Sequence, residues 1–126
     1  MYDTIIVGGG ASGLMAGCNL RGKVLIIEAS NRVGKKILAT GNGRCNLSNT
    51  DMRGEYYSSP DFFRAVENQL GQNLMDVWSD MGLFTRVDSA GRIYPFSNQA
   101  TTVLDVLRAK LGNGVEILTE TKIKNA

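Results

Sequence analysis

Three glycines near the start of the chain limit the possible fold more than any other feature. Gly8, Gly10 and Gly13 follow an apolar run that reads as a buried strand from Asp3 to Val7. Their spacing matches the Gly-x-Gly-x-x-Gly turn of dinucleotide-binding proteins, in which a strand leads into a helix whose amino end faces a diphosphate. The residues that follow predict that helix from about Ser12 to Leu20.

A carboxylate stands where this turn requires one. The run Val24–Ile27 is apolar throughout, as expected of a parallel strand covered on both faces, and Glu28 follows it, 20 residues after Gly8. An acidic residue at that distance accepts hydrogen bonds from a ribose, and its charge opposes the 2′-phosphate of NADP. Residues 1–28 therefore predict a βαβ unit that holds the ADP half of a dinucleotide.

The middle of the chain divides by pattern into two stretches. Residues 29–59 are rich in Gly, Asn, Ser and charged residues, and we expect them to form mostly ordered loop. Residues 60–99 predict an insert of two helices and a hairpin. The expected elements of this insert are a helix from Pro60 to Leu70 stopped by Gly71, a helix from Leu74 to Met81 ended by Gly82, and strands at Leu83–Val87 and Arg92–Tyr94.

Residues 100–126 predict a helix followed by a third parallel strand. The helix is expected over Ala100–Leu111, with Thr102 and Asp105 at capping-box spacing, and the strand over Val115–Ile123. The predicted fold class is thus α/β, with a Rossmann-like parallel sheet. Because three strands with few covering helices do not complete a doubly wound domain, we expect a domain that is incomplete at its C-terminus.

Composition excludes several kinds of site and partner. The chain has no histidine and only two cysteines, Cys18 and Cys45, so neither a metal site nor a Ser-His-Asp triad is expected. Residues 1–53 carry seven Lys/Arg against three Asp/Glu, whereas residues 54–126 carry seven against nine. The positive charge therefore accompanies the glycine turn, where a diphosphate would need it, and the rest gives no reason to expect nucleic acid.

The sequence gives no sign of a membrane or export segment. No apolar run approaches the roughly 20 residues that a membrane span needs. Strand-like sequence begins within three residues of Met1, which leaves no room for a signal peptide. We therefore expect a cytoplasmic protein without a membrane partner.

The segment after Glu28 carries a family resemblance. Arg32, Lys35 and Lys36 place three cations, with Gly34, beside the predicted ribose and diphosphate. The run from Gly34 to Asn49, with Gly-Asn-Gly-Arg-Cys-Asn at its centre, resembles the bacterial FAD-dependent oxidoreductase family that includes L-aminoacetone oxidase and a flavoprotein of bile-acid dehydroxylation. The likeness continues through Gly91–Pro95 and into the helix from Ala100, so it covers essentially the whole chain.

This resemblance implies a glutathione-reductase-type FAD domain, interrupted by a substrate domain, in a chain several times longer. It implies that the glycine turn, Lys35 and Lys36 lie at the diphosphate, that Glu28 binds the ribose, and that residues 41–46 run toward the flavin ring. The backbone of the last strand would bind adenine at Ile123. The implied cofactor-binding residues are Gly8, Gly10, Ala11, Ser12, Gly13, Glu28, Ala29, Lys35, Lys36, Gly41, Asn42, Gly43, Arg44, Cys45, Asn46 and Ile123.

We call residues 41–46 the flavin-side run. Two of its residues are candidates for the chemistry itself. Arg44 can stabilise negative charge on a reduced flavin or on a substrate carboxylate. Cys45 is either a thiol near the flavin, with its pKa lowered by Arg44, or a small residue that fills a tight turn. We favour the second interpretation, because one cysteine without a CxxC partner cannot form the usual dithiol couple.

The predicted function is a flavin-dependent oxidoreductase. A small organic substrate would transfer a hydride to FAD, and O2 or NAD(P) would reoxidise the flavin. Two alternatives stay open: an NAD-dependent dehydrogenase on the same βαβ unit, which leaves residues 41–46 without a role, and a truncated fragment that binds nucleotide weakly or not at all. An RNA-modifying flavoprotein would need a basic surface beyond the cofactor loop, and residues 54–126 are net acidic.

Overall fold

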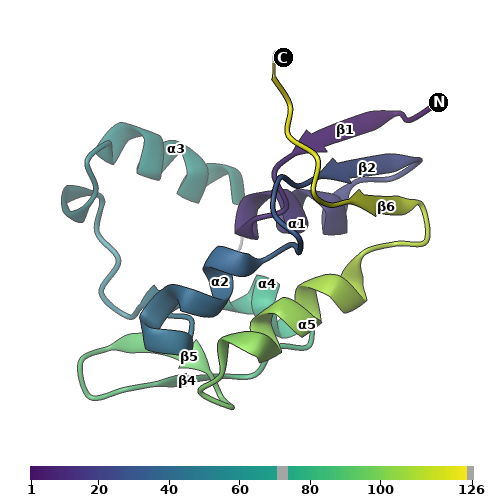
Figure 1. Ribbon diagram of the computed structural model, residues 1–126. Coiled ribbons are helices and arrows are strands. Elements are labelled where there is room, and N and C mark those ends of the chain that lie inside the picture. Colours follow the sequence, from purple (N-terminus) through teal and green to yellow (C-terminus); the bar gives the residue numbers. More distant parts are fainter. Residues whose placement is uncertain (71–73, 125–126) are drawn as a thin grey trace.

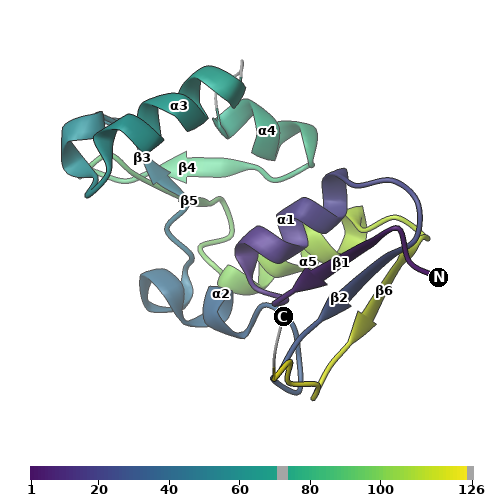
Figure 2. The same cartoon turned by 90° about the horizontal axis from the view of Figure 1, so that it is seen from above.

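The chain folds into two groups of elements joined by a short helix (Figures 1 and 2). The computed structural model describes residues 1–70 and 74–124. The elements are β1 (Thr4–Val7), α1 (Ala11–Asn19), β2 (Val24–Ile27), α2 (Lys35–Ala39), the 3-10 turn η1 (Thr40–Gly43), β3 (Ser48–Asn49), the 3-10 turn η2 (Gly54–Tyr56), α3 (Pro60–Leu70), α4 (Leu74–Asp80), β4 (Thr85–Val87), β5 (Arg92–Pro95), α5 (Ala100–Lys110) and β6 (Val115–Leu118).

The first group is a parallel sheet in the order β1-β2-β6. Thr4 pairs with Val24, which in turn pairs with Val115, and the register continues residue by residue along all three strands. The central strand is the most buried, and Val24 and Ile26 have no exposed surface. A parallel sheet reached through helical crossovers is what the βαβ pattern predicts, so the α/β fold class is confirmed.

Helices α1 and α5 cover one face of this sheet (Figure 2). Helix α1 lies close because Gly17 has no side chain: a Cβ there would stand 3.0 Å from Leu111 and 3.1 Å from Ile26. The opposite face is uncovered, and Ile5 and Val7 on β1 are 57% and 62% exposed. A half-covered parallel sheet is unusual, because such strands are normally buried on both faces.

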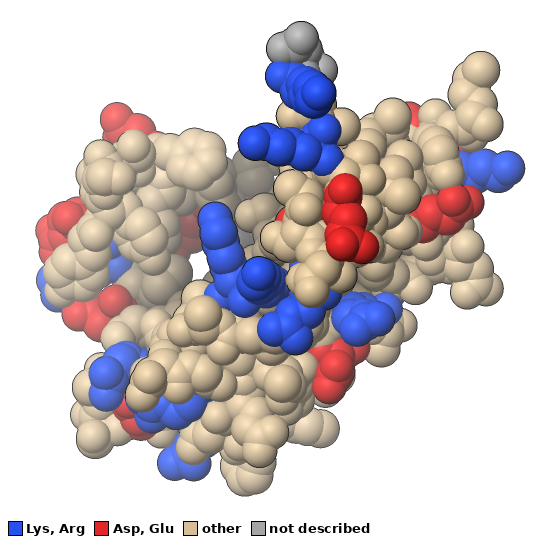
Figure 3. Space-filling view, in the orientation of Figure 1, with Lys and Arg blue, Asp and Glu red and all other residues tan. Residues whose placement is uncertain are grey.

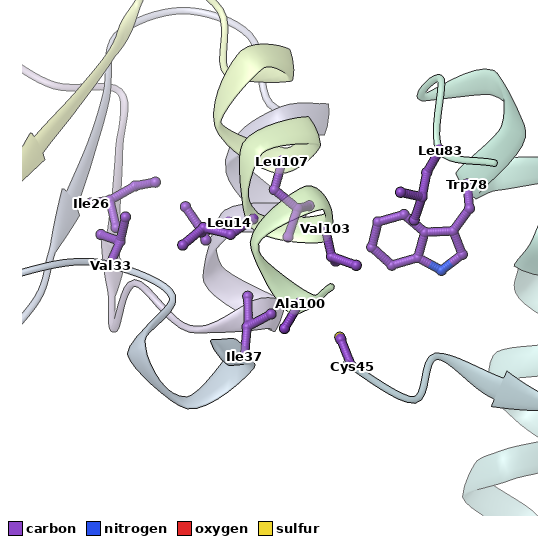
Figure 4. Close-up of a cluster of buried hydrophobic side chains, with 11 residues drawn as sticks. Leu14, Ile26, Val33, Ile37, Cys45, Trp78, Leu83, Ala100, Val103 and Leu107 are labelled. Carbon is purple, nitrogen blue, oxygen red and sulfur yellow. The ribbon is translucent and has the colours of Figure 1, made fainter. Parts of the chain in front are cut away.

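The second group is an antiparallel sheet, β3-β5-β4, accompanied by α3 and α4. One apolar cluster joins it to the first group: Trp78 and Leu83 pack toward α5 near Val103 (Figure 4). The buried members of the cluster are Leu14, Ile26, Val33, Ile37, Cys45, Trp78, Leu83, Ala100, Val103, Leu104 and Leu107. The two groups therefore share a core.

Most of residues 29–59 lie outside helices and strands, as expected, but the stretch also contains a short helix that the sequence did not indicate. Gly34 adopts a left-handed conformation (φ 70°) and starts α2, which buries Ile37 in the core. A Cβ on Gly34 would stand 2.3 Å from Leu104, so the start of α2 packs directly on α5. This helix has five residues, too few to show a helical period in the sequence. Further along, β3 pairs with β5.

The last strand is shorter than expected. β6 ends at Leu118, and Glu120 takes a left-handed conformation (φ 54°) that ends the extended run. Ile123 therefore lies outside the strand, five residues beyond its end.

The remaining helix predictions agree with the structure apart from their caps. Helix α5 begins at Ala100 with Gln99 as its N-cap residue, so the capping box at Thr102 was wrong. The Thr102 hydroxyl instead lies 2.7 Å from that of Ser97. Helices α3 and α4 form where predicted, although Gly71, the expected stop of α3, lies outside the described residues. Within the described ranges no helix has the length and apolarity to cross a bilayer.

Candidate dinucleotide site

The glycine turn joins β1 to α1 and leaves open space over two of its glycines. Gly8 has φ 105° and donates its backbone N–H to Ile27 O at 2.8 Å. A Cβ built on Gly8 or Gly10 would meet no atom of the described residues within 4 Å. A Cβ on Gly13, in contrast, would stand 1.9 Å from the Gly8 carbonyl oxygen. Gly13 therefore closes the turn, while Gly8 and Gly10 leave room for a ligand to approach the backbone.

The amino end of α1 is also open and polar. Gly10 is the N-cap residue, and among the residues that the structure describes no side chain caps the helix; its first turn holds no acidic residue. Ala11 and Ser12 are exposed. Because the first N–H groups of a helix lack internal partners and carry the positive end of its dipole, this end suits an anion such as a diphosphate.

Glu28, at the end of β2, is held against the glycine turn. Its Oε2 accepts the backbone N–H of Gly9 at 2.8 Å, and its Oε1 accepts the backbone N–H of Ser30 at 2.7 Å. These hydrogen bonds, the Ser30 one first, hold the pKa of the Glu28 carboxyl below its ordinary value. An ionised carboxylate offers about four acceptor sites. Glu28 can therefore accept ribose hydroxyls while it keeps both backbone partners.

Gly9, to which sequence reasoning gave no role, joins the glycine turn to Glu28 and to the start of α2. Gly9 is buried, and a Cβ there would stand 2.4 Å from Val33 and 3.3 Å from the Glu28 side chain. Its carbonyl accepts the N–H of Gly34 at 2.7 Å, which joins the turn to the start of α2. The signal was that Gly9 stands between two other glycines, at a position that the fingerprint treats as variable.

Cations gather beside the turn. Lys35 and Lys36 are exposed in the first residues of α2, and the charge of Lys36 helps to lower the pKa of Glu28. Arg32 and Ala29 are exposed in the preceding loop. Figure 3 shows Lys and Arg side chains over α2 and along the segment that leads to the C-terminus. The predicted concentration of positive charge therefore lies where α2 and the end of β2 meet.

The segment after β6 passes the same place. The backbone N–H of Glu120 donates to Ser30 O at 2.9 Å, and that of Thr121 donates to Glu28 O at 3.1 Å. Ile123 follows two residues later and is 36% exposed. The structure thus brings the C-terminal segment beside Glu28 and Ser30, although not as a strand.

The flavin-side run, residues 41–46, follows the C-terminal end of α2, and four of its residues have positive φ angles. Gly41, Asn42, Gly43 and Cys45 have φ values of 55°, 56°, 81° and 57°. A Cβ on Gly41 would stand 2.6 Å from the Asn46 nitrogen, whereas one on Gly43 would meet no atom within 4 Å. Backbone conformations of this kind are concentrated at functional sites.

Arg44 is held in place by Tyr94, a residue given no role from the sequence. Its guanidinium lies 4.5 Å from the centroid of the Tyr94 ring, and its Nη2 is 3.4 Å from the Tyr94 hydroxyl. Its Nε donates to Gly41 O at 3.4 Å. Tyr94 is 3% exposed, so the ring is a fixed support for the arginine. The signal for Tyr94 was its place in the Gly91–Pro95 run.

The other two residues at the end of this run have structural contacts. Cys45 is 7% exposed and belongs to the apolar cluster, which supports the packing interpretation. Asn46 uses its Nδ2 to donate to Ser48 O at 3.0 Å and to Ile93 O at 3.1 Å, and so ties the run to β3 and β5. In the part of the chain that the structure describes, no three potential metal ligands lie close enough together to hold an ion.

Comparison with known sequences identifies relatives along most of the chain. The family that matches residues 2–126 is described as "HI0933-like protein Rossmann domain". A 3-dehydro-bile acid delta(4,6)-reductase from Clostridium scindens is 43% identical over 114 residues, covering 84% of this chain and 28% of the relative. A ribosomal RNA dihydrouridine synthase from Escherichia coli is 31% identical over 113 residues, which cover 84% of this chain and 28% of the relative. The chain thus spans less than a third of the length of either relative.

A solved structure supports the fold. The crystal structure of Thermovibrio ammonificans THI4 superposes with a TM-score of 0.59 over 94% of this chain and 38% of that protein. The sequence identity is 18%, so this likeness concerns the fold alone.

Proposed function

Since the chain belongs to the HI0933-like family, whose Rossmann domain implies FAD, we propose that it is the FAD-binding portion of an oxidoreductase that transfers a hydride between a small organic substrate and FAD. One observation carries the cofactor assignment: open space over Gly8 and Gly10, at an uncapped helix end, next to a carboxylate that the turn itself holds in place. The relatives whose names are given above are enzymes, which supports a catalytic role for the whole protein.

The residues at the glycine turn suit the ADP half of FAD. The free N–H groups at the start of α1 bind the diphosphate, and Lys35 and Lys36 offset its charge. Glu28 accepts the ribose hydroxyls and, because it is ionised, disfavours a nucleotide with a 2′-phosphate. The backbone near Ile123, beyond the strand in which it was expected, is a candidate for contacts with adenine.

The residues beyond α2 suit the flavin half. When bound, FAD supplies a ring that accepts and donates a hydride. Gly41 to Gly43 bring backbone without bulky side chains to the ring, and Arg44 stabilises negative charge there. Tyr94 keeps the guanidinium in position. We assign no general acid or base, and we give Cys45 no role in the chemistry because it is buried in the core.

The direction of hydride transfer and the partners are part of the proposal. The sequence favours a substrate that gives its hydride to FAD, with O2 or NAD(P) as acceptor. A relative that is named a reductase favours the opposite direction, from reduced flavin to substrate, as a second candidate. We propose a small-molecule substrate and neither nucleic acid nor membrane as partner. The net acidic character of residues 54–126 supports the first exclusion.

Titration with FAD and with NADH, followed by flavin or nicotinamide fluorescence, tests this proposal against its rivals. The proposal predicts saturable binding of FAD that an equal concentration of NADH does not displace. Tighter binding of NADH than of FAD would favour an NAD-dependent dehydrogenase. A folded chain that binds neither would favour a fragment without nucleotide binding.

A further inference from the structure

A groove of about 610 Å³ lies beside β3, outside the dinucleotide site. Its walls come from residues 46–49, from the following turn with Asp51 and Met52, and from Tyr56 and Tyr57 at η2. Leu74 and Ala90 complete the lining. This volume falls within the range of pockets that bind small organic molecules and cofactors.

The groove offers rings and a polarisable sulfur. Tyr57 is stacked on Phe63, with ring centroids 4.3 Å apart and an interplanar angle of 17°. The Met52 sulfur lies 3.2 Å from the hydroxyls of both Ser48 and Tyr57. Phe63 therefore contacts one face of the Tyr57 ring, and the Met52 sulfur contacts its hydroxyl. A fixed aromatic face next to a thioether favours contact with another flat or apolar ring.

The charged groups at the groove pair with one another. Among the described residues that line the groove, Asp51 is the one that carries a charge, and both of its carboxylate oxygens lie 2.9 Å from guanidinium nitrogens of Arg53. Arg53 also pairs with Glu55 at 3.0 Å, and its guanidinium lies 4.7 Å from the centroid of the Tyr56 ring. Two carboxylates share this one guanidinium, so an anionic ligand would meet no free cation. An RNA strand, which needs several cations for its phosphates, fits this lining poorly.

The groove begins where the flavin-side run ends. Asn46 is the last residue of that run and the first of the groove lining. Both hydrogen bonds of its Nδ2 go to backbone oxygens, at Ser48 and Ile93, so its Oδ1 is the side-chain atom that can accept a hydrogen bond from a ligand. A molecule in the groove would therefore lie next to the segment to which we assign the flavin ring.

We propose that this groove is the substrate-side pocket and that it takes an uncharged ring compound. The inference rests on the proposed function, because the groove counts as a substrate pocket only if the flavin ring lies at residues 41–46. It adds a chemical class of ligand and a set of lining residues. Rings pack on Tyr57 and Met52, and Arg53, already paired with two carboxylates, gives no advantage to an anionic group.

Two steroids that differ in one charged group test the proposal. Progesterone is an uncharged ring compound, and 3-oxoandrost-4-ene-17-carboxylate has the same rings with a carboxylate. Equilibrium dialysis against the chain should show tighter binding of progesterone. Tyr57→Ala should weaken that binding about tenfold, as loss of an aromatic contact residue commonly does. Met52→Lys adds a cation to the groove and should reverse the preference in favour of the carboxylate.

Phe84→Ala is the matched control, because Phe84 is 78% exposed and does not line the groove. The Phe84→Ala variant should bind progesterone as tightly as the unaltered chain does. Met52 and Tyr57 are 36% and 41% exposed, so both variants should fold, and circular dichroism checks this. If Tyr57→Ala unfolds, the test depends on Met52→Lys alone, which should bind the carboxylate more tightly than progesterone.

The inference is overturned by no binding of progesterone, by equal or tighter binding of the carboxylate, or by binding that Tyr57→Ala and Met52→Lys leave unchanged. Tighter binding of an oligoribonucleotide than of progesterone would overturn it as well. FAD titration of the same samples separates the two proposals. A chain that binds FAD but fails the steroid test refutes the groove alone, whereas a chain that does not bind FAD refutes the proposed function.

Discussion

The backbone N–H of Gly9 donates to Oε2 of Glu28 at 2.8 Å, so the glycine turn and the end of β2 hold each other in place. The carboxylate that a ribose would contact is thereby oriented before any ligand arrives. The same hydrogen bond makes the charge of Glu28 part of the stability of the fold, which leads to a prediction about pH.

Glu28→Gln should remove a pH-dependent part of the stability. The folded-state pKa of Glu28 lies below its ordinary value of 4.5, so folding favours the ionised form. The contribution is therefore complete above pH 4.5 and is lost as the pH falls through the lowered pKa. The difference in free energy of unfolding between the original chain and Glu28→Gln should be constant near neutral pH and should shrink below pH 4.5.

Urea unfolding at a series of pH values measures this difference. Glu120→Gln is the control, because that carboxyl is exposed at the surface. A difference that stays constant down to the acid range would contradict the account of Glu28.

Gly13→Ala should destabilise the chain. The new Cβ would stand 1.9 Å from the carbonyl oxygen of Gly8, a backbone atom that can move only with the whole turn. Overpacking of this kind costs about 1–3 kcal/mol. Thermal or urea unfolding measures the loss, and Gly112→Ala, whose Cβ would meet no atom within 4 Å, should leave the stability nearly unchanged. Equal stability of the two variants would show that the turn is not packed as described.

Arg44→Ala should make the reduction potential of bound FAD more negative. The guanidinium, held over the Tyr94 ring, stabilises negative charge on the reduced flavin more than the neutral oxidised form. A tenfold loss of that preference lowers a two-electron potential by about 30 mV. Spectroscopic redox titration of the FAD-bound protein measures the shift, with the exposed Arg86→Ala as control. A potential that Arg44→Ala does not change would remove Arg44 from the flavin site.

Cys45→Ala should affect stability rather than cofactor binding. The thiol is 7% exposed within the apolar cluster, so its removal leaves a small cavity and costs about 1 kcal/mol. The affinity for FAD should stay the same, and the thiol should react slowly with a thiol reagent in the folded chain. A redox role for Cys45 would be indicated by rapid reaction together with loss of flavin reduction in the variant.

The first 28 residues could be predicted from the sequence because their signals are local. An apolar strand, the glycine turn and an acidic residue at the end of the second strand each occur within a few residues of the element they define. Helix α3 has equally local signals, with Pro60 at its first position. Each of these elements can therefore be predicted from nearby residues alone.

The features that were missed depend on contacts between distant residues. Gly9 is constrained by Val33 and Glu28, and α2 by the contact of Gly34 with Leu104. β3 has two residues and exists because β5 lies beside it. The support of Arg44 by Tyr94 joins residues 50 positions apart. Most of these partners lie far apart in the sequence, so a local pattern could not reveal the contacts between them.

The end of β6 was missed for a different reason. The residues from Val115 to Ile123 have the composition of a strand, but Glu120 adopts a left-handed conformation that glutamate rarely takes. Its N–H bonds Ser30 O, a contact that turns the chain toward the end of β2. Composition favoured continuation of the strand, and tertiary contact ended it.

The most direct test of the central claim is the FAD affinity of Gly10→Ala, measured by fluorescence titration beside its thermal stability. The added Cβ points into space that no described protein atom occupies, so stability should equal that of the original chain. If a diphosphate lies against that backbone, the affinity should fall at least about tenfold, or roughly 1.4 kcal/mol. An unchanged affinity in a variant that is equally stable would show that no cofactor binds over the glycine turn.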